Sequence, residues 1–348
     1  MYNSYDEIFS QGDILKETYE EISANSDRIK DFFNVDNYDY EEIVFVACGS
    51  SYWLSMSACM TFQEKLGKRC FAVKSGDVVM NTDYYLNAYK KPLLIAPSRS
   101  GNTSETLMAL KSLRDHYRCR ILCMVEDKEA SIINLCDLVL EFPWAFEVSV
   151  CQTRSFSNLY MASVMVAALA GGDDSLLKDL RRYIDDFDRI SGNAENLLGR
   201  IIRDFPQCDK LITLGNGKIY GVSIEGAYIA IEMALLPSNY YGTLEFRHGP
   251  VVMADPAYLV VFFSGGNGRK YEEDMALDVR RKGSKIIAIS SGDDFINADY
   301  RFNIGREAAP EVVALYGIMV MQGFAHLKAV DLGRDPDSPG DLVQWIKL

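Results

Sequence analysis

The feature that most restricts the fold of this chain is an internal repeat with a period of about 165 residues. Gly49 and Gly215 each end an apolar, β-branched run, and they lie 166 residues apart. Three such runs recur in the same order: residues 43–49 at 210–215, residues 93–98 at 259–264, and residues 121–125 at 286–290. Matched runs in one order predict two copies of a single domain built from strands and helices.

Each copy has the pattern of a parallel sheet covered by helices. Amphipathic stretches such as 105–117 and 271–282 alternate with short strands that are apolar throughout, a pattern typical of sheets buried on both faces. In the first copy, strands are expected near residues 43–47, 70–74, 92–97, 120–125 and 138–142. The predicted fold class is therefore α/β, with two tandem doubly wound domains of the flavodoxin-like type, each with a parallel five-stranded sheet.

The expected domain organisation follows from breaks in this pattern. Gly171 and Gly172 interrupt the apolar run of the first copy, and a charged amphipathic stretch then continues to Pro206. We expect an N-terminal helical segment at 1–30, a first domain at 31–172, a helical connector at 173–206, a second domain at 207–330 and a C-terminal tail at 331–348. The tail ends in apolar residues, so we expect it to be docked.

Charge and composition narrow the list of partners. The formal net charge of −13 repels phosphate backbones and anionic membranes, so neither nucleic acid nor a membrane is an expected partner. The N-terminus lacks the basic and then apolar order of a secretory signal. The longest apolar stretches, at residues 159–170 and 312–321, have the length of core helices. We expect a cytoplasmic protein whose eight scattered cysteines are reduced.

The segment at residues 98–106 offers the groups that hold a phosphate. It lies between a buried strand and a helix, whose free N–H groups favour an anion. Capping of that helix would use one or two hydroxyls, fewer than the segment supplies. The hydroxyls, one cation and a flexible glycine come from Ser98, Arg99, Ser100, Gly101 and Thr103. We predict a phosphate site here. The small residues at 48–51, which include Ser51, permit approach to the same ligand but are equally typical of a plain turn.

The sequence gives no sign of a metal or a redox cofactor. Residues 215–221 resemble a dinucleotide-binding loop, but the third glycine comes one place late. No P-loop pattern occurs in the sequence. The three histidines are far apart, without clustered cysteines or an H-E-x-x-H motif. We therefore expect neither a metal nor a cofactor.

Two residues of the second copy are candidates for proton transfer. Glu232 stands among apolar neighbours in a predicted helix, where burial would raise the pKa of its carboxyl and suit it to act as a general base. The alternative is a glutamate that faces solvent. His248 lies in a charged loop that ends in a Gly-Pro turn, whereas His116 and His326 have the surroundings of structural residues.

Together these motifs resemble the sugar isomerase (SIS) domain family, specifically its double-domain proteins related to the isomerase half of glucosamine-6-phosphate synthase. Residues 48–51 match the family's C-G-[TS]-S, and residues 98–103 match its S-x-S-G-x-T phosphate loop. Residues 245–250 match its E-x-x-H-G-P, with Glu232 sixteen residues before the histidine, as the pattern expects. Residues 335–339 resemble its D-x-D-x-P tail, and the resemblance covers residues 30–348.

The resemblance implies a phosphosugar site in the first copy. It also implies that Glu232 moves a proton between C1 and C2 of the sugar, and that His248 reaches in from a partner subunit to help open the ring. The partner would be a second copy of this chain, in a homodimer, and this proton transfer needs no metal or redox cofactor. The implied phosphosugar residues are Ser51, Ser98, Arg99, Ser100 and Thr103, with Val150 and Gln152 on the following loop.

Three positions depart from the family's pattern. Gln344 aligns with the tail lysine of the synthase, so it is also expected among the substrate-binding residues. Only Lys347 is nearby, so Schiff-base chemistry does not follow from the resemblance. Gln152 stands where the family has a serine, and Ile229 stands where the synthase has a lysine at its sugar site. No glutaminase domain accompanies the two copies, so we do not expect a glutamine-dependent synthase.

Three functions fit these residues. The first is an aldose–ketose isomerase or deaminase that acts on an amino-sugar 6-phosphate such as glucosamine 6-phosphate. The phosphate loop, Glu232 and His248 favour it. The second is a deglycase that cleaves a phosphorylated fructosamine, and Arg247 and the Asp-Pro-Asp tail favour the first function over this one. The third is a non-enzymatic sugar-phosphate sensor, against which the presence of Glu232 and His248 argues.

Overall fold

The computed structural model describes residues 2–266, 268–292 and 295–348, which form two compact units. The first-sheet unit consists of residues 13–147, 154–181 and 343–348. The second-sheet unit consists of residues 2–12, 148–153 and 182–342. Each unit therefore includes short segments from distant parts of the sequence, which a division of the chain in sequence order does not contain.

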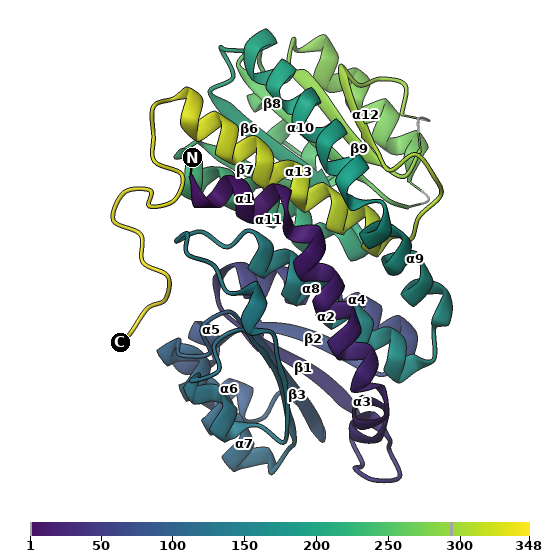
Figure 1. The fold of residues 1–348 in the computed structure, drawn as a ribbon, viewed down its shortest axis with the longest axis vertical. Helices are drawn as coiled ribbons and strands as arrows, with labels where there is room; N and C mark the ends of the chain where they lie inside the picture. Colours follow the sequence, from purple (N-terminus) through teal and green to yellow (C-terminus); the bar gives the residue numbers. More distant parts are fainter. Residues whose placement is uncertain (1, 267, 293–294) are drawn as a thin grey trace. The chain divides into compact units, whose positions relative to one another are not determined.

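A parallel five-stranded sheet forms the centre of the first-sheet unit (Figure 1), as predicted. Its order is β2-β1-β3-β4-β5, and β1 pairs in parallel with both β2 and β3. Every residue of β1, β3 and β4 is buried, which explains why these strands are almost entirely apolar. The strands are β1 (Glu42–Ala47), β2 (Arg69–Lys74), β3 (Pro92–Ser98), β4 (Ile121–Val125) and β5 (Leu138–Glu141).

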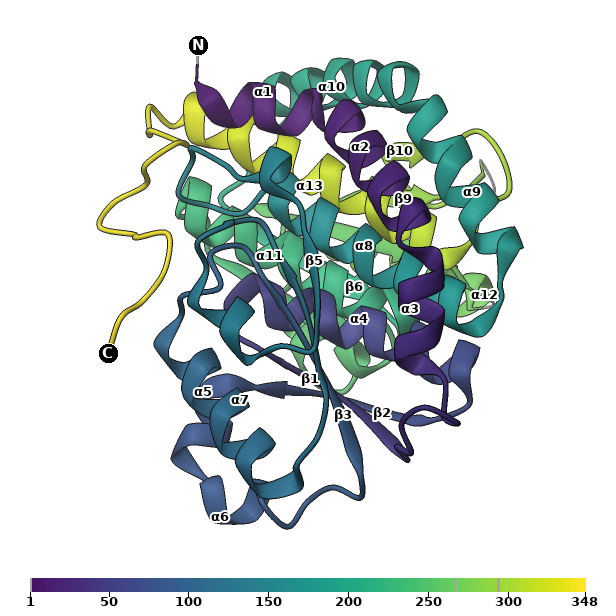
Figure 2. The same ribbon diagram turned by 60° about the horizontal axis from the view of Figure 1, so that its bottom comes forward.

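Helices cover both faces of this sheet (Figure 2). Side chains of α5 (Ser75–Met80) and α7 (Ser104–Tyr117) pack on the face that carries Val44 and Val46. On the opposite face, Phe62 of α4 (Gly49–Leu66) makes an edge-to-face contact with Phe45. α8 (Arg154–Gly171) packs against α4 and buries every side chain from Ser155 to Leu169. The unit also contains α3 (Ser26–Phe33), α6 (Thr82–Tyr85), η1 (Ser131–Leu135) and η2 (Pro143–Ala145), while α2 (Gln11–Ala24) and α9 (Asp174–Asp185) belong partly to each unit.

The second-sheet unit repeats this topology. Its strand order is β10-β9-β8-β6-β7, so β6, β8 and β9 occupy the places of β1, β3 and β4. The three runs that repeat in the sequence are equivalent strands, which confirms the predicted fold class and its two tandem copies. The strands are β6 (Lys210–Gly215), β7 (Ser238–Gly242), β8 (Tyr258–Ser264), β9 (Lys285–Ser290) and β10 (Tyr300–Asn303).

Helices also cover both faces of the second sheet. α11 (Tyr220–Ala234) and α13 (Pro310–Asp331) pack together on one face. On the other face, Met275 and Val279 of α12 (Arg269–Arg281) join the core formed by Ile212 and Val260. α1 (Asn3–Phe9) and α10 (Phe187–Asp204) contact α13, and the short helical turns are η3 (Gly217–Ile219), η4 (Glu245–Arg247) and η5 (Pro250–Met253).

The last helix, α13, is long and apolar enough to cross a membrane by its length and composition alone. However, 94% of its apolar window is buried inside the structure. It packs against α10, α11, β8 and β9. Its apolar composition is therefore that of a helix in the core of the second-sheet unit.

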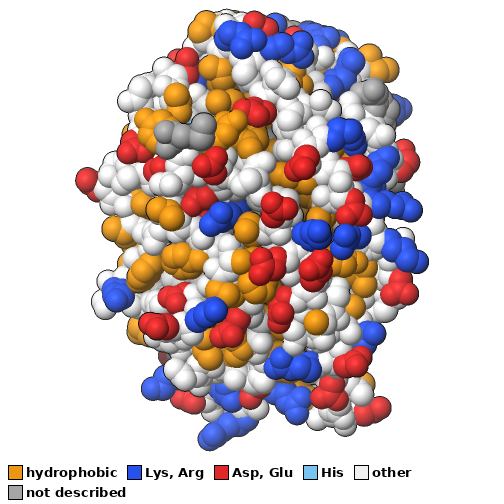
Figure 3. Space-filling view, in the orientation of Figure 1, with side chains coloured by type: hydrophobic (Ala, Val, Ile, Leu, Met, Phe, Trp, Pro, Cys, Tyr) orange, Lys and Arg blue, Asp and Glu red, His pale blue; other side chains and the backbone are white. Residues whose placement is uncertain are grey.

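Charged side chains of both signs are interspersed on the face shown in Figure 3. Neither the acidic nor the basic side chains gather there into one continuous area. On this face the acidic side chains therefore lie among basic ones.

Gly317 marks a close approach of α13 to the second sheet. A Cβ at this position would lie 2.5 Å from Cε1 of Phe263 and 3.3 Å from Cγ2 of Ile289, and both side chains are buried. We predict that Gly317→Ala lowers the free energy of unfolding by about 1–3 kcal/mol, because the packed core has to shift. Gly192 in α10 has open space around it. Gly192→Ala should therefore raise the free energy of unfolding by about 0.5–1 kcal/mol through helix propensity. Urea denaturation measures both changes, and an unchanged Gly317→Ala variant would contradict the close approach.

Candidate functional site

Two helices that begin beside each other at the carboxyl edge of the first sheet define the candidate site. β1 and β3 are neighbours, and α4 follows β1 while α7 follows β3. The two helices cover opposite faces of the sheet, so the chain leaves this edge in two directions. In doubly wound sheets, ligands bind outside the carboxyl ends of the strands at such a switch point. Both predicted phosphate motifs lie there.

The start of α4 is suited to an anion. Gly49 has a φ of +53°, in the left-handed region that favours glycine, and Cys48 at the N-cap makes no side-chain capping bond. The first turn contains no acidic residue that would offset the positive end of the helix dipole. Ser51 lies in this turn and is buried.

The loop from Ser98 to Thr103 is held in shape by its own side chains. The hydroxyl of Ser98 accepts the N–H of Gly101 at 2.9 Å, and the hydroxyl of Ser100 accepts the N–H of Asn102 at 3.2 Å. A hydroxyl that accepts a hydrogen bond keeps its own proton, so both serines are able to donate to a ligand oxygen. Thr103 is the N-cap of α7 and makes no side-chain capping bond.

Gly101 is a position where only glycine fits this loop. Its φ is +58°, and a Cβ here would lie 2.5 Å from Cβ of Ala130 and 2.7 Å from Cγ2 of Ile132. The N–H of Ile132 also donates to the carbonyl of Gly101 at 3.1 Å. The loop is therefore packed tightly against the segment that follows β4.

Arg99 and Gln344, which sequence analysis predicted as site residues from opposite ends of the chain, lie together. The buried guanidinium of Arg99 places Nη1 3.4 Å from Oε2 of Glu147, and its Nη2 donates to the carbonyl of Gln344 at 3.0 Å. The side-chain amide of Gln344 donates to the carbonyl of Glu147 at 3.3 Å. Whether Arg99 or Gln344 contacts a phosphosugar stays a prediction.

The tail segment, residues 343–348, continues to the start of α7. The carbonyl of Ile346 accepts the N–H of Ser104 at 3.4 Å, and the N–H of Leu348 donates to the hydroxyl of Ser104 at 3.1 Å. Val343, Ile346 and Leu348 nevertheless keep exposed side chains. The tail segment is docked, as expected, but by backbone hydrogen bonds more than by its apolar side chains.

Glu126 is a buried acid directly beneath the phosphate loop. Its N–H donates to the carbonyl of Arg99 at 3.3 Å, and its Oε1 accepts the side-chain amide of Asn158 at 2.9 Å. Burial raises the pKa of Glu126 to about 8. The negative charge of Glu147 also raises this pKa, whereas a hydrogen bond with Ser155 lowers it. The carboxyl of Glu126 is therefore neutral at pH 7.

The two candidates for proton transfer lie in the second-sheet unit. Glu232 is half-buried in the last turn of α11, so its carboxyl is less enclosed than its apolar neighbours in the sequence imply. The fully buried glutamate of this helix is Glu225. His248 directly follows η4, and its side chain is exposed. Its backbone N–H donates to the carbonyl of Glu245 at 3.0 Å. The charged loop around it includes an ion pair between Arg247 and Asp278 at 2.8 Å.

Val150 and Gln152 belong to the segment 148–153 of the second-sheet unit. The N–H of Val150 donates to the carbonyl of Asp337 at 2.9 Å, within the predicted acidic tail motif. Oε1 of Gln152 is buried and has no hydrogen-bond partner among the described residues. The roles of both residues toward a sugar stay predictions.

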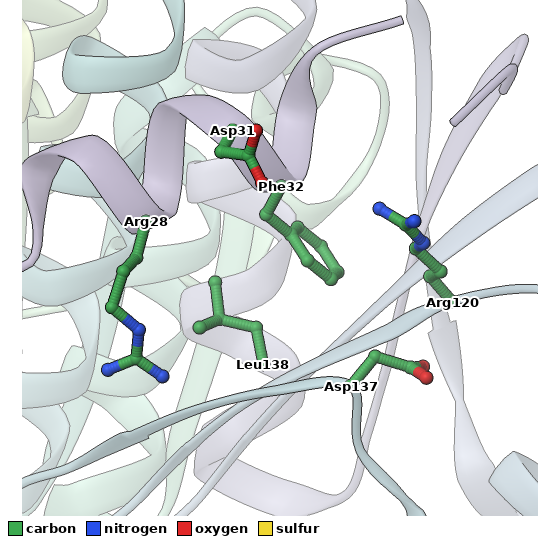
Figure 4. A pocket seen from close by; sticks show the side chains of 6 residues that line it. All are labelled: Arg28, Asp31, Phe32, Arg120, Asp137 and Leu138. Carbon is green, nitrogen blue, oxygen red and sulfur yellow. The ribbon is translucent and has the colours of Figure 1, made fainter. Parts of the chain in front are cut away.

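A separate hollow of about 370 Å³ lies at the other end of the first sheet, at the amino ends of β4 and β5 (Figure 4). Asp137, on its wall, already accepts hydrogen bonds from Arg114 and from the N–H of Ile121. The hollow is lined by Arg28, Asp31, Phe32, Arg120, Asp137 and Leu138. Because the strands are parallel, it is distinct from the site at their carboxyl ends.

Sequence analysis did not identify the buried glutamates, which include Glu126, Glu147 and Glu225. For Glu126 a signal was present, because it directly follows an apolar strand and so had to lie at the carboxyl edge of the sheet. Glu147 pairs with a residue 48 positions away, and no local pattern announces such a contact.

The pKa of Glu126 generates a test by pH. The folded chain binds this proton more tightly than the unfolded chain, since the pKa rises from 4.5 to about 8 on folding. The contribution of Glu126 to stability therefore falls as the pH rises from about 4.5 to about 8. Glu126→Gln mimics the neutral acid, so it should match the wild type near pH 4 and exceed its free energy of unfolding by about 2–4 kcal/mol above pH 8. Urea denaturation across this range is the measurement, and a difference independent of pH would contradict the raised pKa.

The SIS domain family matches two regions of the chain, residues 38–170 and residues 204–327. Among curated relatives, the isomerizing glutamine–fructose-6-phosphate aminotransferase of Sulfurisphaera tokodaii is 22% identical over 342 residues. The match covers 98% of this chain and 56% of that protein. The chain thus spans about half the length of the curated relatives it matches.

Solved structures share the fold at low sequence identity. Glucosamine-6-phosphate deaminase from Thermotoga maritima matches with a TM-score of 0.84 and 24% identity, over 99% of this chain and 100% of that one. Tagatose-6-phosphate ketose/aldose isomerase from Escherichia coli matches with a TM-score of 0.83 and 23% identity, over 98% and 95% of the two chains. The family match covers well over half of the chain, in two regions that each contain one of the parallel sheets. This protein belongs to the SIS domain family, as its motifs predicted.

Proposed function

We propose that this protein is a phosphosugar isomerase or deaminase that acts on an amino-sugar 6-phosphate of the glucosamine 6-phosphate type. The observation that carries the proposal is the phosphate loop at the β1/β3 switch point, with the uncapped start of α4 on the neighbouring strand. Each of the three relatives described above has a sugar 6-phosphate in its name. The loop and the names support the phosphate group of the proposed substrate, and the names support its sugar class.

We assign recognition of the phosphate to the first-sheet unit. Its donors are the hydroxyls of Ser51, Ser98, Ser100 and Thr103 together with backbone N–H groups at the starts of α4 and α7. These donors are neutral, and they act at hydrogen-bond distance. The repulsion from distant acidic groups is screened beyond about 10 Å at ordinary ionic strength, so a net charge of −13 does not oppose binding there.

We assign proton transfer to Glu232 and His248 of the second-sheet unit. His248 moves a proton from O1 to O5 as the ring opens to the aldehyde. Glu232 then removes the proton from C2 and returns it to C1. From glucosamine 6-phosphate this gives a C2 imine, and water hydrolyses the imine to the ketose 6-phosphate and ammonia.

We further propose that the protein works as a homodimer in which His248 serves the site of the partner subunit. The support is that His248 is exposed on the single chain, at a loop whose Gly249 has a φ of +127° and so turns the backbone sharply. An exposed histidine in a fixed turn is what a site shared with a second copy requires.

The phosphate loop is tested by removing its hydroxyls. A hydrogen bond to a charged group contributes about 1.5–3 kcal/mol, so Ser100→Ala combined with Thr103→Ala should weaken binding of glucosamine 6-phosphate by about 10- to 100-fold. Binding of unphosphorylated glucosamine should change little. Isothermal titration calorimetry measures both affinities. Ser131→Ala, an exposed serine after the same loop, is the control, and equal losses for both sugars would remove the loop as the phosphate site.

The chemistry is tested with glucosamine 6-phosphate in heavy water. The wild type should release ammonia or exchange the C2 proton for deuterium, as followed by proton NMR. Glu232→Gln should lower turnover by at least about 1,000-fold while sugar-phosphate binding is kept, because only the base is lost. Glu245→Gln, an exposed glutamate nearby, serves as the control.

Two other results would redirect the assignment. Amino-acid release from a fructosamine 6-phosphate, with no reaction of glucosamine 6-phosphate, would make the protein a deglycase. Tight binding without turnover of either sugar would make it a sensor.

The shared site is tested with mixed dimers. Subunits with Glu232→Gln and subunits with His248→Asn should each be inactive alone, but together they should restore part of the activity. An active monomer would exclude the shared site.

A further inference from the structure

Arg99 stands inside the phosphate loop, but its guanidinium is engaged elsewhere. It pairs with Glu147 at 3.4 Å and donates to the carbonyl of Gln344 at 3.0 Å. Its side chain is only 4% exposed, and that of Glu147 is fully buried. All three residues belong to the first-sheet unit. One side chain therefore joins the loop, the segment before residue 148 and the tail segment.

The ion pair is the fixed part of this arrangement, and the tail segment is attached to it. A buried guanidinium requires a full opposite charge, which Glu147 supplies and the carbonyl of Gln344 does not. Glu126 does not compete for the pair, because its raised pKa keeps it neutral. The tail segment is bound to the guanidinium of Arg99 and also to the backbone carbonyl of Glu147, which accepts the side-chain amide of Gln344.

Apolar burial contributes little to holding the tail segment. The side chains of Val343, Ile346 and Leu348 are 63%, 52% and 81% exposed, and Trp345 is half-buried. The attachments of the tail segment before the chain reaches Ser104 include the polar contacts of Gln344 with Arg99 and with the backbone of Glu147. At Ser104 the tail segment uses both the backbone N–H and the hydroxyl of the first residue of α7.

We propose that Arg99 and Glu147 are positioning residues that hold the tail segment on Ser104, where the carbonyl of Ile346 competes with an anion for the first N–H of α7. This inference rests on the proposed function only in taking the loop beside Ser104 as the phosphate site. Arg99 then acts on phosphate binding through the tail segment and not as a ligand. A phosphosugar has to displace the tail segment from Ser104 to gain that N–H.

The test uses a charge-balanced double variant of the full chain, Arg99→Met with Glu147→Gln. Replacement of a buried pair by neutral groups of similar size keeps the core folded, whereas removal of one partner alone leaves a buried charge. The net charge near the loop is unchanged, so a change in anion affinity does not come from a lost charge. Thermal unfolding of the variant checks that it is folded.

Arg154 offers a matched control. Its side chain is half-buried, and it donates to the carbonyls of Ala145 and Phe146, in the same segment that carries Glu147. Within the described part of the chain, Arg154 forms no hydrogen bond or ion pair with the tail segment. Arg154→Met therefore disturbs the segment around residue 146 and leaves the attachment of the tail segment in place.

Two measurements decide the proposal. Hydrogen exchange of the backbone N–H groups of Leu348 and Ser104, which are hydrogen-bonded in the docked tail, should become at least about tenfold faster in the double variant and stay unchanged in Arg154→Met. Inorganic phosphate, titrated by calorimetry, should bind the double variant about three- to tenfold more tightly, since one competing hydrogen bond is gone.

Unchanged exchange in the double variant, or equal release in Arg154→Met, would overturn the positioning role. A released tail segment with unchanged or weaker phosphate binding would overturn the competition. If neither the wild type nor the variants bind phosphate, the proposed phosphate site fails, and the exchange measurement still decides whether Arg99 and Glu147 hold the tail segment.

Discussion

The parallel pairing of β1 with β3 is the constraint on which the candidate site depends. Residues 42–45 of β1 lie opposite residues 92–95 of β3, so the two strands end side by side. The chain then leaves β1 toward one face of the sheet and β3 toward the other. Two helix starts thus adjoin one edge, and the N–H groups of both are directed outward, away from the packed core. A strand inserted between β1 and β3 would separate the two phosphate motifs without altering either one.

The fold could be predicted from the sequence because the inner strands of each sheet are buried almost throughout, while the edge strands β2, β5, β7 and β10 are partly exposed. An apolar run bounded by turns then has one interpretation, and the predicted strands 43–47, 70–74 and 138–142 differ from β1, β2 and β5 by one residue at most. The equivalence of the two sheets followed from the repeat alone. What the sequence does not contain is the assignment of short segments to units, since 148–153 and 343–348 are placed by hydrogen bonds to residues far along the chain.

The site was predicted less completely, and α11 shows why. Glu225 and Glu232 are seven residues apart, so they lie on nearly the same face of the helix and have similar apolar neighbours. Their burial differs because Glu225 lies in the middle of the helix, whereas Glu232 lies in its last turn, before Leu235 adopts a left-handed conformation. Helical periodicity gives the direction of a side chain but not how far the surrounding elements extend along the helix. A local pattern therefore identified Glu232 as a candidate and missed the glutamate that is fully enclosed.

Arg99 shows that a cation in a predicted phosphate loop can already be paired inside the protein. Its guanidinium has two carboxyl groups nearby, Glu126 and Glu147, and burial of both as anions would leave an unpaired charge in the core. Protonation of Glu126 resolves this, because one cation then faces one anion. The cluster beneath the loop is neutral as a whole, and the loop presents hydroxyl and N–H donors outward. Such donors select an anion by its shape and hydrogen-bond geometry, so the proposed phosphate site is compatible with a strongly acidic chain and does not require a compensating basic surface beside it.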